Sequence, residues 1–197
     1  MTKTAGVVAI QGNVRAHEAA IRRAGREAGT PIQIRRIRRP GAVPACDLLT
    51  VPGGESTTIS RGLAKTGIGE EIADHVEADK PLLATCAGLI VTASNVDDPR
   101  VEPLGVLDVT IERNAFGRQR ESFEAGLEIE GLGEQFPGVF IRAPVVDSTG
   151  PGVTPLATVD GRTVAVKQGP VVGTAFHPEL TESTALHRWA LFDRASD

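Results

Sequence analysis

The sequence predicts an α/β protein with a mostly parallel sheet and helices on both faces. Short buried strands alternate with helix-like segments through the first half of the chain, as in sheets whose parallel strands are joined by crossover helices. The composition, 41% hydrophobic and 23% charged over 197 residues, is typical of a globular protein with a sizeable core. We therefore expect a single domain over residues 1–197.

The elements of the first half follow each other in near alternation. We expect strands at 6–10, 32–37, 48–51 and 81–85, and helices at 14–28, 58–65, 69–77 and 87–94. The second half is rich in strands, which are expected at 106–112, 123–129, 139–141, 156–159, 163–168 and 171–175. Asp160-Gly161 is a hairpin signal between two of these strands. Residues 95–103 are expected to form a polar connection, and a helix at 183–192 follows the last strand.

Cys86 stands where an expected strand turns sharply into a helix, in the segment Thr85-Cys86-Ala87-Gly88. Such a turn exposes one side chain above the sheet. The positive end of the helix dipole favours the thiolate, which is the nucleophilic form of cysteine. The backbone N–H of Ala87 points to the place where an oxyanion would form. A buried structural thiol is the alternative for an isolated cysteine.

A histidine and a glutamate follow the strand expected at 171–175, in the segment His177-Pro178-Glu179. Residues i and i+2 of an extended chain face the same side, so His177 and Glu179 can lie side by side. A nucleophile needs a base, and the base needs a group that orients it, so Cys86, His177 and Glu179 supply a complete triad. The remaining histidines are expected to be solvated or packing residues: His17, His75 and His187.

A glycine turn, Pro52-Gly53-Gly54-Glu55, follows the strand expected at 48–51. Because glycine allows a ligand to approach the backbone closely, the N–H of Gly54 is a candidate second oxyanion donor. A plain tight turn is the alternative. Ligands of open parallel sheets bind beyond the carboxyl ends of the strands, where Gly54, Cys86 and His177 fall.

The charge of the chain is unevenly distributed. The formal net charge is −4, but residues 1–40 alone carry nine Lys/Arg and two Asp/Glu. This basic segment can be a solvated face, a protein docking surface or a nucleic-acid site. No aromatic residue interleaves its arginines and no binding motif accompanies them, so nucleic acid is the least favoured of the three.

The cysteine count and the hydropathy pattern indicate a cytoplasmic protein. The chain has two cysteines, Cys46 and Cys86, and neither belongs to a metal-type pair. A disulfide between them would destroy the proposed nucleophile, so a reducing compartment is expected, with Cys46 as a packing residue. No apolar run approaches the roughly 20 residues of a membrane span, and no signal peptide is expected.

Together, these motifs resemble those of the class I (triad) glutamine amidotransferases. The resemblance rests on residues 52–57, 85–88 and 177–179. It implies a three-layer, flavodoxin-like α/β domain in which Cys86, His177 and Glu179 hydrolyse the side-chain amide of glutamine. The first glycine of the family's Gly-x-Cys-x-Gly elbow is Ala84 in this chain, a departure that puts only the rate in doubt.

Further segments are similar to the glutaminase subunits of pyridoxal 5'-phosphate synthases. They are residues 9–13, 113–119, 122–124, 140–144 and 173–181. This resemblance implies that the glutamine pocket is formed by Gly54, Glu55, Ser56, Arg113, Ile141 and Arg142. Either Arg113 or Arg142 can pair with the α-carboxylate, and Glu55 with the ammonium group. Solvation at the surface is the alternative for both arginines.

The same resemblance implies a partner and no cofactor or metal. Ammonia would pass to a separate barrel-fold pyridoxal 5'-phosphate synthase subunit in a large hetero-oligomer, and vitamin B6 would be made there. Two other functions compete. One is a different cysteine hydrolase, such as a γ-glutamyl peptidase or a glutaminase that serves another synthase. The other is a non-catalytic regulatory module, which the intact triad argues against.

Overall fold

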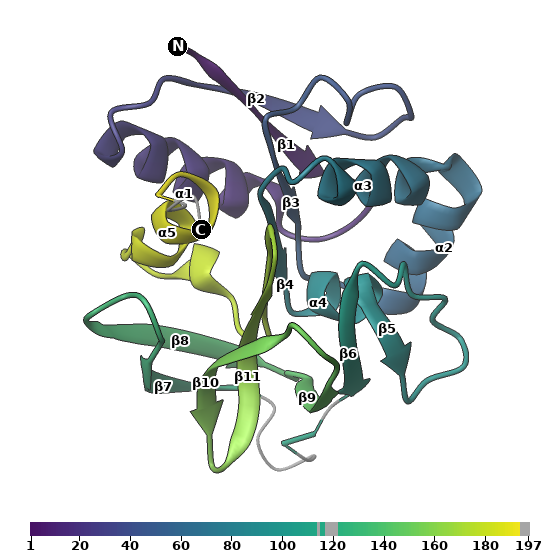
Figure 1. Cartoon of the computed structure of the whole chain (residues 1–197), viewed down its shortest axis with the longest axis vertical. Coiled ribbons are helices and arrows are strands. Elements are labelled where there is room, and N and C mark those ends of the chain that lie inside the picture. Colours follow the sequence, from purple (N-terminus) through teal and green to yellow (C-terminus); the bar gives the residue numbers. More distant parts are fainter. Residues whose placement is uncertain (114, 117–121, 194–197) are drawn as a thin grey trace.

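The computed structural model describes residues 1–113, 115–116 and 122–193. Within these residues a ten-stranded sheet runs through the molecule in the order β2-β1-β3-β4-β12-β11-β9-β6-β5, with β10 paired to β11 (Figure 1). Its strands are β1 (Lys3–Val8), β2 (Ile32–Ile37), β3 (Leu48–Val51), β4 (Leu82–Thr85), β5 (Ala93–Val96), β6 (Leu107–Glu112), β9 (Val145–Thr149), β10 (Thr154–Val159), β11 (Arg162–Gln168) and β12 (Val171–Thr174). A separate pair consists of β7 (Ser122–Glu128) and β8 (Gln135–Ile141).

The half of the sheet from β2 to β12 is parallel throughout, and the pairings of β11 with β12, β9 and β10 are antiparallel. Every residue of β3, β4 and β12 is buried, as expected for central strands with helices on both faces. Since all parallel strands end at the same edge of the sheet, the segments that follow β1, β3, β4 and β12 meet there.

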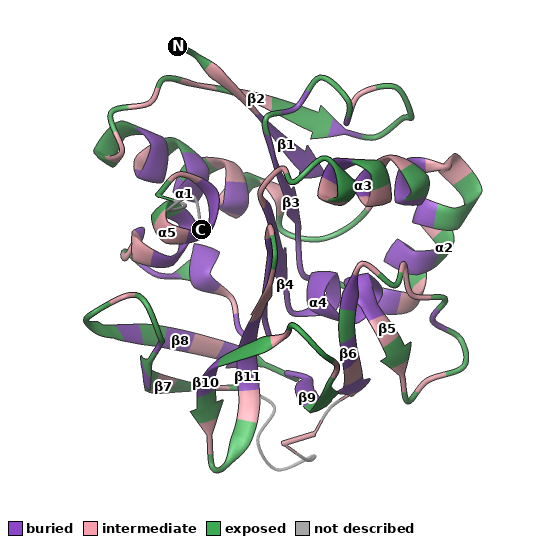
Figure 2. Cartoon of the chain, viewed as in Figure 1, coloured by how far each residue is buried: buried purple, intermediate pink, exposed green. Residues whose placement is uncertain are grey.

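Helices cover both faces of this parallel half, which confirms the three-layer α/β fold. Helices α1 and α5 lie on one side of β1, β3 and β4, and α2, α3 and α4 lie on the other (Figure 1). The helices are α1 (Val14–Glu27), α2 (Ser56–Thr66), α3 (Ile68–Glu77), α4 (Ala87–Thr92) and α5 (Ala185–Leu191), with a short 3-10 helix, η1 (Pro178–Leu180). Figure 2 shows the buried faces of the helices turned toward the buried strands.

Local sequence sets the ends of the helices that flank the site. Helix α1 begins after Asn13, whose Oδ1 accepts a hydrogen bond from the N–H of Ala16. Helix α2 begins after Glu55, whose carboxylate accepts from the N–H groups of Thr57 and Thr58. It ends at Gly67, which adopts the left-handed conformation that favours glycine (φ 76°).

The structure corrects several expectations about the elements from residue 87 onward. The helix expected at 87–94 ends at Thr92, and residues 93–96 form β5, so the polar connection expected at 95–103 begins later. Strand β5 is a short edge strand that pairs with β6 alone, and its polar sequence carries little strand signal. Strand β9 was not expected, because only its first two residues are buried. Strand β8 begins at Gln135, four residues before the expected start at 139. These residues were missed in the sequence because Pro137 weakens the strand pattern there.

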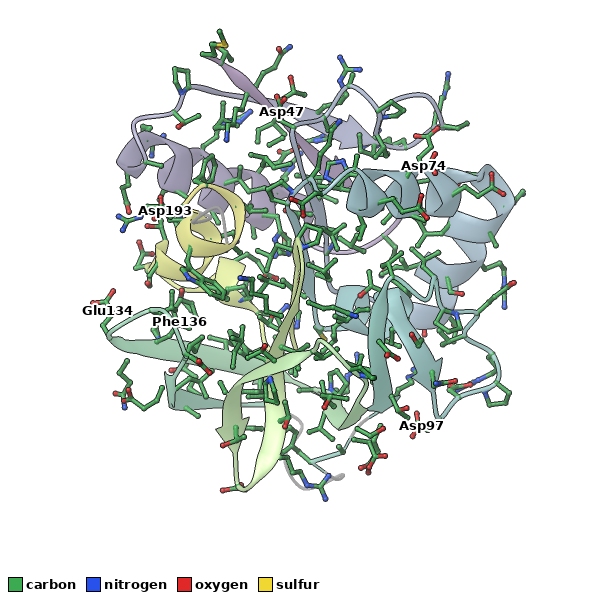
Figure 3. All side chains as sticks on the ribbon, in the orientation of Figure 1. Asp47, Asp74, Asp97, Glu134, Phe136 and Asp193 are labelled. Atoms are coloured by element: carbon green, nitrogen blue, oxygen red, sulfur yellow. The ribbon has the colours of Figure 1, made fainter. Side chains whose placement is uncertain are left out.

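Most charged residues are exposed or half-buried, and the large apolar residues lie in the core. Among the residues labelled in Figure 3, Asp74, Glu134 and Asp193 are exposed. Phe136 and Phe176 are among the largest fully buried side chains. No helix in the described part of the chain is long and apolar enough to cross a membrane.

Candidate active site

Cys86 occupies a strained turn between β4 and α4. Its backbone has φ 51° and ψ −107°, a conformation that non-glycine residues rarely adopt. The turn is held by neighbouring backbone: the N–H of Cys86 donates to the carbonyl of Thr174, 2.7 Å away. A side-chain carbon on Gly88 would collide with the carbonyl oxygen of Val51. Strain retained at one residue by a rigid surrounding is typical of functional sites.

His177 and Glu179 lie directly beyond β12 and are in contact. The Nδ1 atom of His177 is 2.8 Å from Oε1 of Glu179, whose side chain is 1% exposed. A carboxylate only accepts hydrogen bonds, so Nδ1 is the donor and Nε2 is left to face a substrate or a nucleophile. The backbone N–H of His177 donates to the carbonyl of Val139 at 2.8 Å, which anchors the segment to β8.

The structure brings Cys86 to this histidine. The Cys86 side chain lies close enough to the imidazole to help raise the pKa of His177. Both lie against Gly53, where an added Cβ would be 2.6 Å from Cε1 of His177 and 3.2 Å from Cβ of Cys86. The glycine turn after β3 therefore closes over the pair, and only a residue without a side chain fits there.

The protonation states of the pair depend on their contacts. Burial disfavours the charge on His177, but its hydrogen bonds with Cys86 and Glu179 outweigh burial and raise the pKa of the imidazole to about 10. Burial likewise disfavours the Glu179 carboxylate, yet hydrogen bonds from His17 and His177 hold its pKa well below the usual range. The arrangement thus stabilises the imidazolium form of His177 against the Glu179 carboxylate.

The two expected oxyanion donors, Gly54 and Ala87, line the same cavity as Cys86. The N–H of Ala87 opens α4 and belongs to the first-turn groups that lack a partner within the helix. Gly54 has φ 154°, and a side-chain carbon there would collide with Oε1 of Gln11. The carbonyl of Gly53 faces Gly12 so closely that a side-chain carbon on Gly12 would collide with it. In a trans peptide, the N–H of Gly54 therefore points away from Gly12.

These groups open into a cavity of about 360 Å³. The expected triad members Cys86 and His177 line it, as does every residue expected in the oxyanion and glutamine sites: Gly54, Glu55, Ser56, Ala87, Arg113, Ile141 and Arg142. The volume suits a ligand the size of an amino acid. Ser56 Oγ is buried and has no hydrogen-bond partner among the described residues.

Two lining residues were missed by the sequence analysis, Gln11 and Ile90. Gln11 was noted as part of a family motif but not as a site residue. It follows β1, which pairs in parallel with β3, and its Oε1 accepts a hydrogen bond of 2.6 Å from the N–H of Glu55. Ile90 lies four residues after Cys86, a helical spacing that places both on one face and was available from the sequence.

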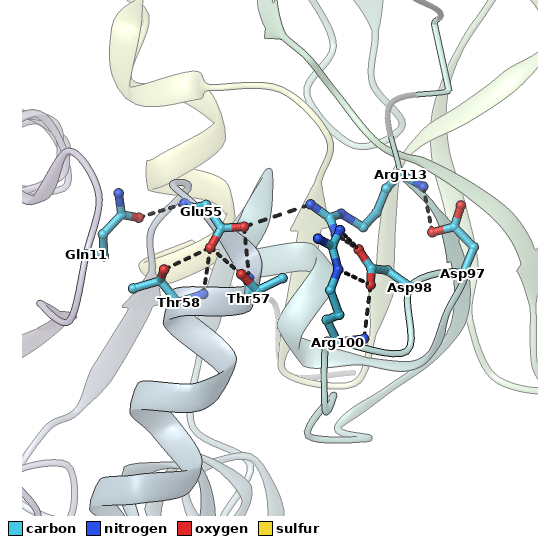
Figure 4. A network of polar contacts seen from close by, with 8 residues as sticks. All are labelled: Gln11, Glu55, Thr57, Thr58, Asp97, Asp98, Arg100 and Arg113. Atoms are coloured by element: carbon cyan, nitrogen blue, oxygen red, sulfur yellow. Dashed lines mark hydrogen bonds and ion pairs between the residues drawn. The ribbon is translucent and has the colours of Figure 1, made fainter.

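The charged rim of the cavity is a network of ion pairs (Figure 4). Glu55 caps α2 through Thr57 and Thr58, and the hydrogen bond from Thr57 is the main cause that lowers the pKa of its carboxyl to about 2. Arg113 contacts Asp98 and lies 3.9 Å from Oε1 of Glu55. Much of the charge of Arg113 is therefore balanced within the protein.

Arg142 differs from Arg113. It is exposed, its backbone has φ 43°, and no carboxylate lies within ion-pair distance of it in the described part of the chain. A lone cation at the rim attracts an anionic ligand group, so Arg142 is the better candidate for a carboxylate partner. The selective segment at 113–119 is described only at residues 113, 115 and 116, and its other positions lie outside the described residues.

The remaining expectations about single residues have mixed outcomes. His17, His75 and His187 are all buried, so the solvated alternative is wrong for each of them. His17 in addition lies 3.3 Å from Glu179, a contact that the helical pattern around it did not indicate. Cys46 is buried, with Sγ 3.3 Å from the carbonyl of Ala42, which agrees with a packing role.

Comparison with known proteins shows the family of this chain. The model of the SNO glutamine amidotransferase family matches residues 7–194. The chain is 61% identical over 194 residues to a Halobacterium salinarum protein named pyridoxal 5'-phosphate synthase subunit PdxT, covering 98% of this chain and 96% of that one. It is 59% identical to the protein of the same name from Haloarcula marismortui, covering 98% of both chains.

Solved structures agree as well. A crystal structure of a glutamine amidotransferase superposes with a TM-score of 0.86 at 46% identity, covering 93% of this chain and 95% of that one. A chain of the PurLQS structure from Thermotoga maritima, at 17% identity and a TM-score of 0.67, covers 95% of this chain and 97% of its own and shares the fold. The chain belongs to the SNO glutamine amidotransferase family.

Proposed function

We propose that the cavity binds L-glutamine and that the Cys86-His177-Glu179 triad hydrolyses its side-chain amide to L-glutamate and ammonia. One observation carries this proposal. A cysteine on a strained elbow lies beside a histidine whose Nδ1 is 2.8 Å from a buried carboxylate, at the wall of a cavity that Gly54 and Ala87 also line. Acyl transfer through a thioester needs this set of groups.

The reaction takes two steps. The Cys86 thiolate attacks the amide carbon, and the N–H groups of Gly54 and Ala87 bind the oxyanion that forms. The His177 imidazolium gives its proton to the leaving nitrogen, which departs as ammonia. The neutral imidazole then takes a proton from water, which hydrolyses the thioester and releases glutamate. Glu179 keeps the Nδ1 proton in place and supports the charge of His177 in both steps.

The rim residues bind the amino-acid end of glutamine. Arg142 pairs with the α-carboxylate, because its charge has no partner among the described residues, and Glu55 pairs with the α-ammonium. Arg113, tied to Asp98, positions Glu55 from the other side. Ser56 supplies a buried hydroxyl that a ligand atom would satisfy.

The ammonia is used by another protein. The relatives that carry the name pyridoxal 5'-phosphate synthase subunit support a barrel-fold synthase as the acceptor in a hetero-oligomer, and vitamin B6 as the product. The whole chain acts as one domain in the cytoplasm, where a free thiol persists; Cys46 and Cys86 are both free cysteines. The isolated chain is a poor glutaminase, since ammonia released without an acceptor is wasted.

Helix α1 supplies the docking surface for the synthase. Its exposed residues Arg15, Arg22 and Arg26 recur at a helical spacing on one face. Arg23, which belongs to the same basic run, is not available for docking. It is half-buried and donates through Nη2 to the carbonyl of Thr181, 2.9 Å away. The surface therefore fits an acidic patch on the partner.

Glutamate formation with and without excess barrel synthase tests the function and the coupling together. We expect strong stimulation by the synthase, and loss of all glutamate formation in Cys86→Ala with folding and co-purification unchanged. Ammonia release by Cys86→Ala would refute the mechanism, and full activity of the chain alone would refute the coupling. A γ-glutamyl peptidase would instead cleave peptides and ignore the synthase.

Charge reversal tests the docking surface. The triple variant Arg15→Glu/Arg22→Glu/Arg26→Glu should lose co-purification with the synthase and its stimulation. A control, Arg38→Glu/Arg39→Glu, reverses two exposed arginines of the loop after β2 and should keep both co-purification and stimulation. Equal losses in the two variants would mean that net charge, and not α1, governs the association.

A further inference from the structure

A second histidine contacts the triad carboxylate. His17 of α1 is fully buried, and its Nε2 lies 3.3 Å from Oε1 of Glu179. The same carboxylate oxygen is 2.8 Å from Nδ1 of His177. Both histidines therefore converge on one oxygen, while Oε2 of Glu179 is buried without a partner among the described residues.

The same atom of His17 is also connected to the glycine turn, through the side chain of Thr85. Its Nε2 lies 3.3 Å from Oγ1 of Thr85, the residue before the nucleophile. That hydroxyl accepts a hydrogen bond of 3.1 Å from the N–H of Gly53. A continuous buried path thus joins the turn that carries Gly54 to the carboxylate that orients the catalytic base.

The contacts of His17 fix its tautomer. A carboxylate only accepts hydrogen bonds, so the ring nitrogen that faces it must carry a hydrogen. The proton of His17 is therefore on Nε2. Nδ1 is buried and has no partner in the described part of the chain, and a bare nitrogen is less costly there than an unpaired N–H. The one hydrogen on Nε2 of His17 therefore faces two acceptors at 3.3 Å, Oε1 of Glu179 and Oγ1 of Thr85.

We propose that His17 is a positioning residue for the hydrolysis, acting through Glu179 on His177 and through Thr85 on the glycine turn. The inference rests on the proposed glutaminase function. The Nε2–H of His17 restrains the plane of the Glu179 carboxylate relative to the His177 ring. Without it, the bond from His177 alone would hold this carboxylate, because Oε2 has no partner among the described residues. Even a small displacement of a catalytic group lowers turnover strongly.

A neighbouring histidine, His187, is buried but has only a packing role. His187 of α5 is also fully buried, with its ring centroid 6.1 Å from that of His17. Neither of its ring nitrogens has a partner among the described residues, and burial lowers the pKa of its imidazole. The two rings share one environment, but only His17 contacts the carboxylate. His187 is therefore the matched control.

Replacing His17 by Gln or by Asn distinguishes the effect of its Nε2 hydrogen bond from the effect of its side-chain volume. The amide nitrogen of His17→Gln reaches as far as Nε2, whereas that of His17→Asn stops near the position of Nδ1. Steady-state kinetics in complex with the synthase should show kcat lowered by about 100-fold in His17→Leu and His17→Asn, with KM nearly unchanged. His17→Gln should recover most of this loss, and His187→Leu should behave like wild type.

Proton NMR of the Nδ1–H of His177 gives a second readout that needs no turnover. The signal should shift or broaden in His17→Leu and His17→Asn, and stay in place in His17→Gln and His187→Leu. Equal kcat and equal spectra for the Gln and Asn variants would overturn the proposal, even if His17→Leu did not fold. Wild-type protein without glutaminase activity would refute the proposed function instead, and the spectra would still decide the role of His17.

Discussion

The triad and the rim of the cavity differ in how far their charged side chains are exposed to solvent. The Glu179 side chain is 1% exposed and contacts two histidines. The Glu55 side chain is 47% exposed, and its carboxylate is shared among the first turn of α2 and Arg113. Buried partners depend on each other, because removal of one leaves the other charged and unpaired. Exposed partners are screened by water and salt, so single losses there are partly compensated.

This difference assigns the two regions different effects on the kinetics. Changes in the buried set should lower kcat, since its geometry matters most in the transition state. Changes at the rim should mainly raise KM, because the rim binds the end of glutamine that does not react. Variants of each region test this division, and the triad variants should show the greatest losses.

The largest effect is expected in the triad itself. His177→Asn should lower kcat by roughly a million-fold, because both proton transfers pass through the imidazole. Glu179→Gln should lower it by about 10,000-fold, since a partly positioned imidazole remains. Rapid-quench assays with the synthase present measure both. A Glu179→Gln variant as active as wild type would reduce Glu179 to a structural residue.

At the rim, the arginines should differ from each other. Arg142→Leu should raise the KM for glutamine by about 10- to 100-fold with kcat little changed, through loss of a charge-assisted hydrogen bond to the α-carboxylate. Arg113→Leu should raise KM less, because Asp98 already balances much of its charge. Arg39→Leu, at an exposed loop position, is the control. A larger effect of Arg113→Leu would exchange the two roles.

The buried pair of His177 and Glu179 should also make the free energy of unfolding depend on pH. His177 has a raised pKa of about 10 against an ordinary value of 6.5, so its contribution is present below pH 6.5 and is lost as pH rises toward 10. Glu179 has a lowered pKa, so its contribution is lost as pH falls below about 4.5. Urea unfolding at pH 6.5 and pH 9.5 should show a decline in wild type that is smaller in His177→Asn. Identical declines would mean that the pair adds nothing to stability.

The smallest effect is expected for Ala84, the departure from the family's elbow. It is fully buried in β4 between Val51 and Gly173, and the elbow at Cys86 forms with the methyl group in place. Ala84→Gly should therefore change kcat by less than about two-fold, with a slight loss of stability from added backbone freedom. A large gain in kcat would show that the methyl group crowds the elbow.

The sequence predicted which residues come together at the cavity better than it predicted the elements around them. Cys86 and His177 were accessible because each directly follows a buried strand, and parallel strands place their carboxyl ends together. The rim residues came from family resemblance, because Arg113 and Arg142 lie in irregular segments without a periodic pattern. Strands β5 and β9 were missed because edge position and exposed faces leave few buried residues to reveal them.

The contact between His17 and Glu179 could not be predicted from either residue alone. His17 lies on the buried face of an amphipathic helix. In the sequence, a histidine that contacts the site cannot be distinguished there from one that only packs in the core. The contact arises because α1 packs across η1 and α5, which come from the opposite end of the chain. Only the three-dimensional arrangement distinguishes His17 from His187.

The most direct test of the central claim is alkylation by a glutamine-like diazo-ketone in the presence of the synthase. The two free cysteines are an internal comparison: Cys86 lines the cavity, whereas Cys46 is buried elsewhere in the core, and burial raises the pKa of its thiol. Mass mapping should find one adduct, on Cys86, formed in step with loss of glutaminase activity and prevented by excess glutamine. An adduct on Cys46, or full activity after complete labelling of Cys86, would contradict the assignment of Cys86 as the nucleophile.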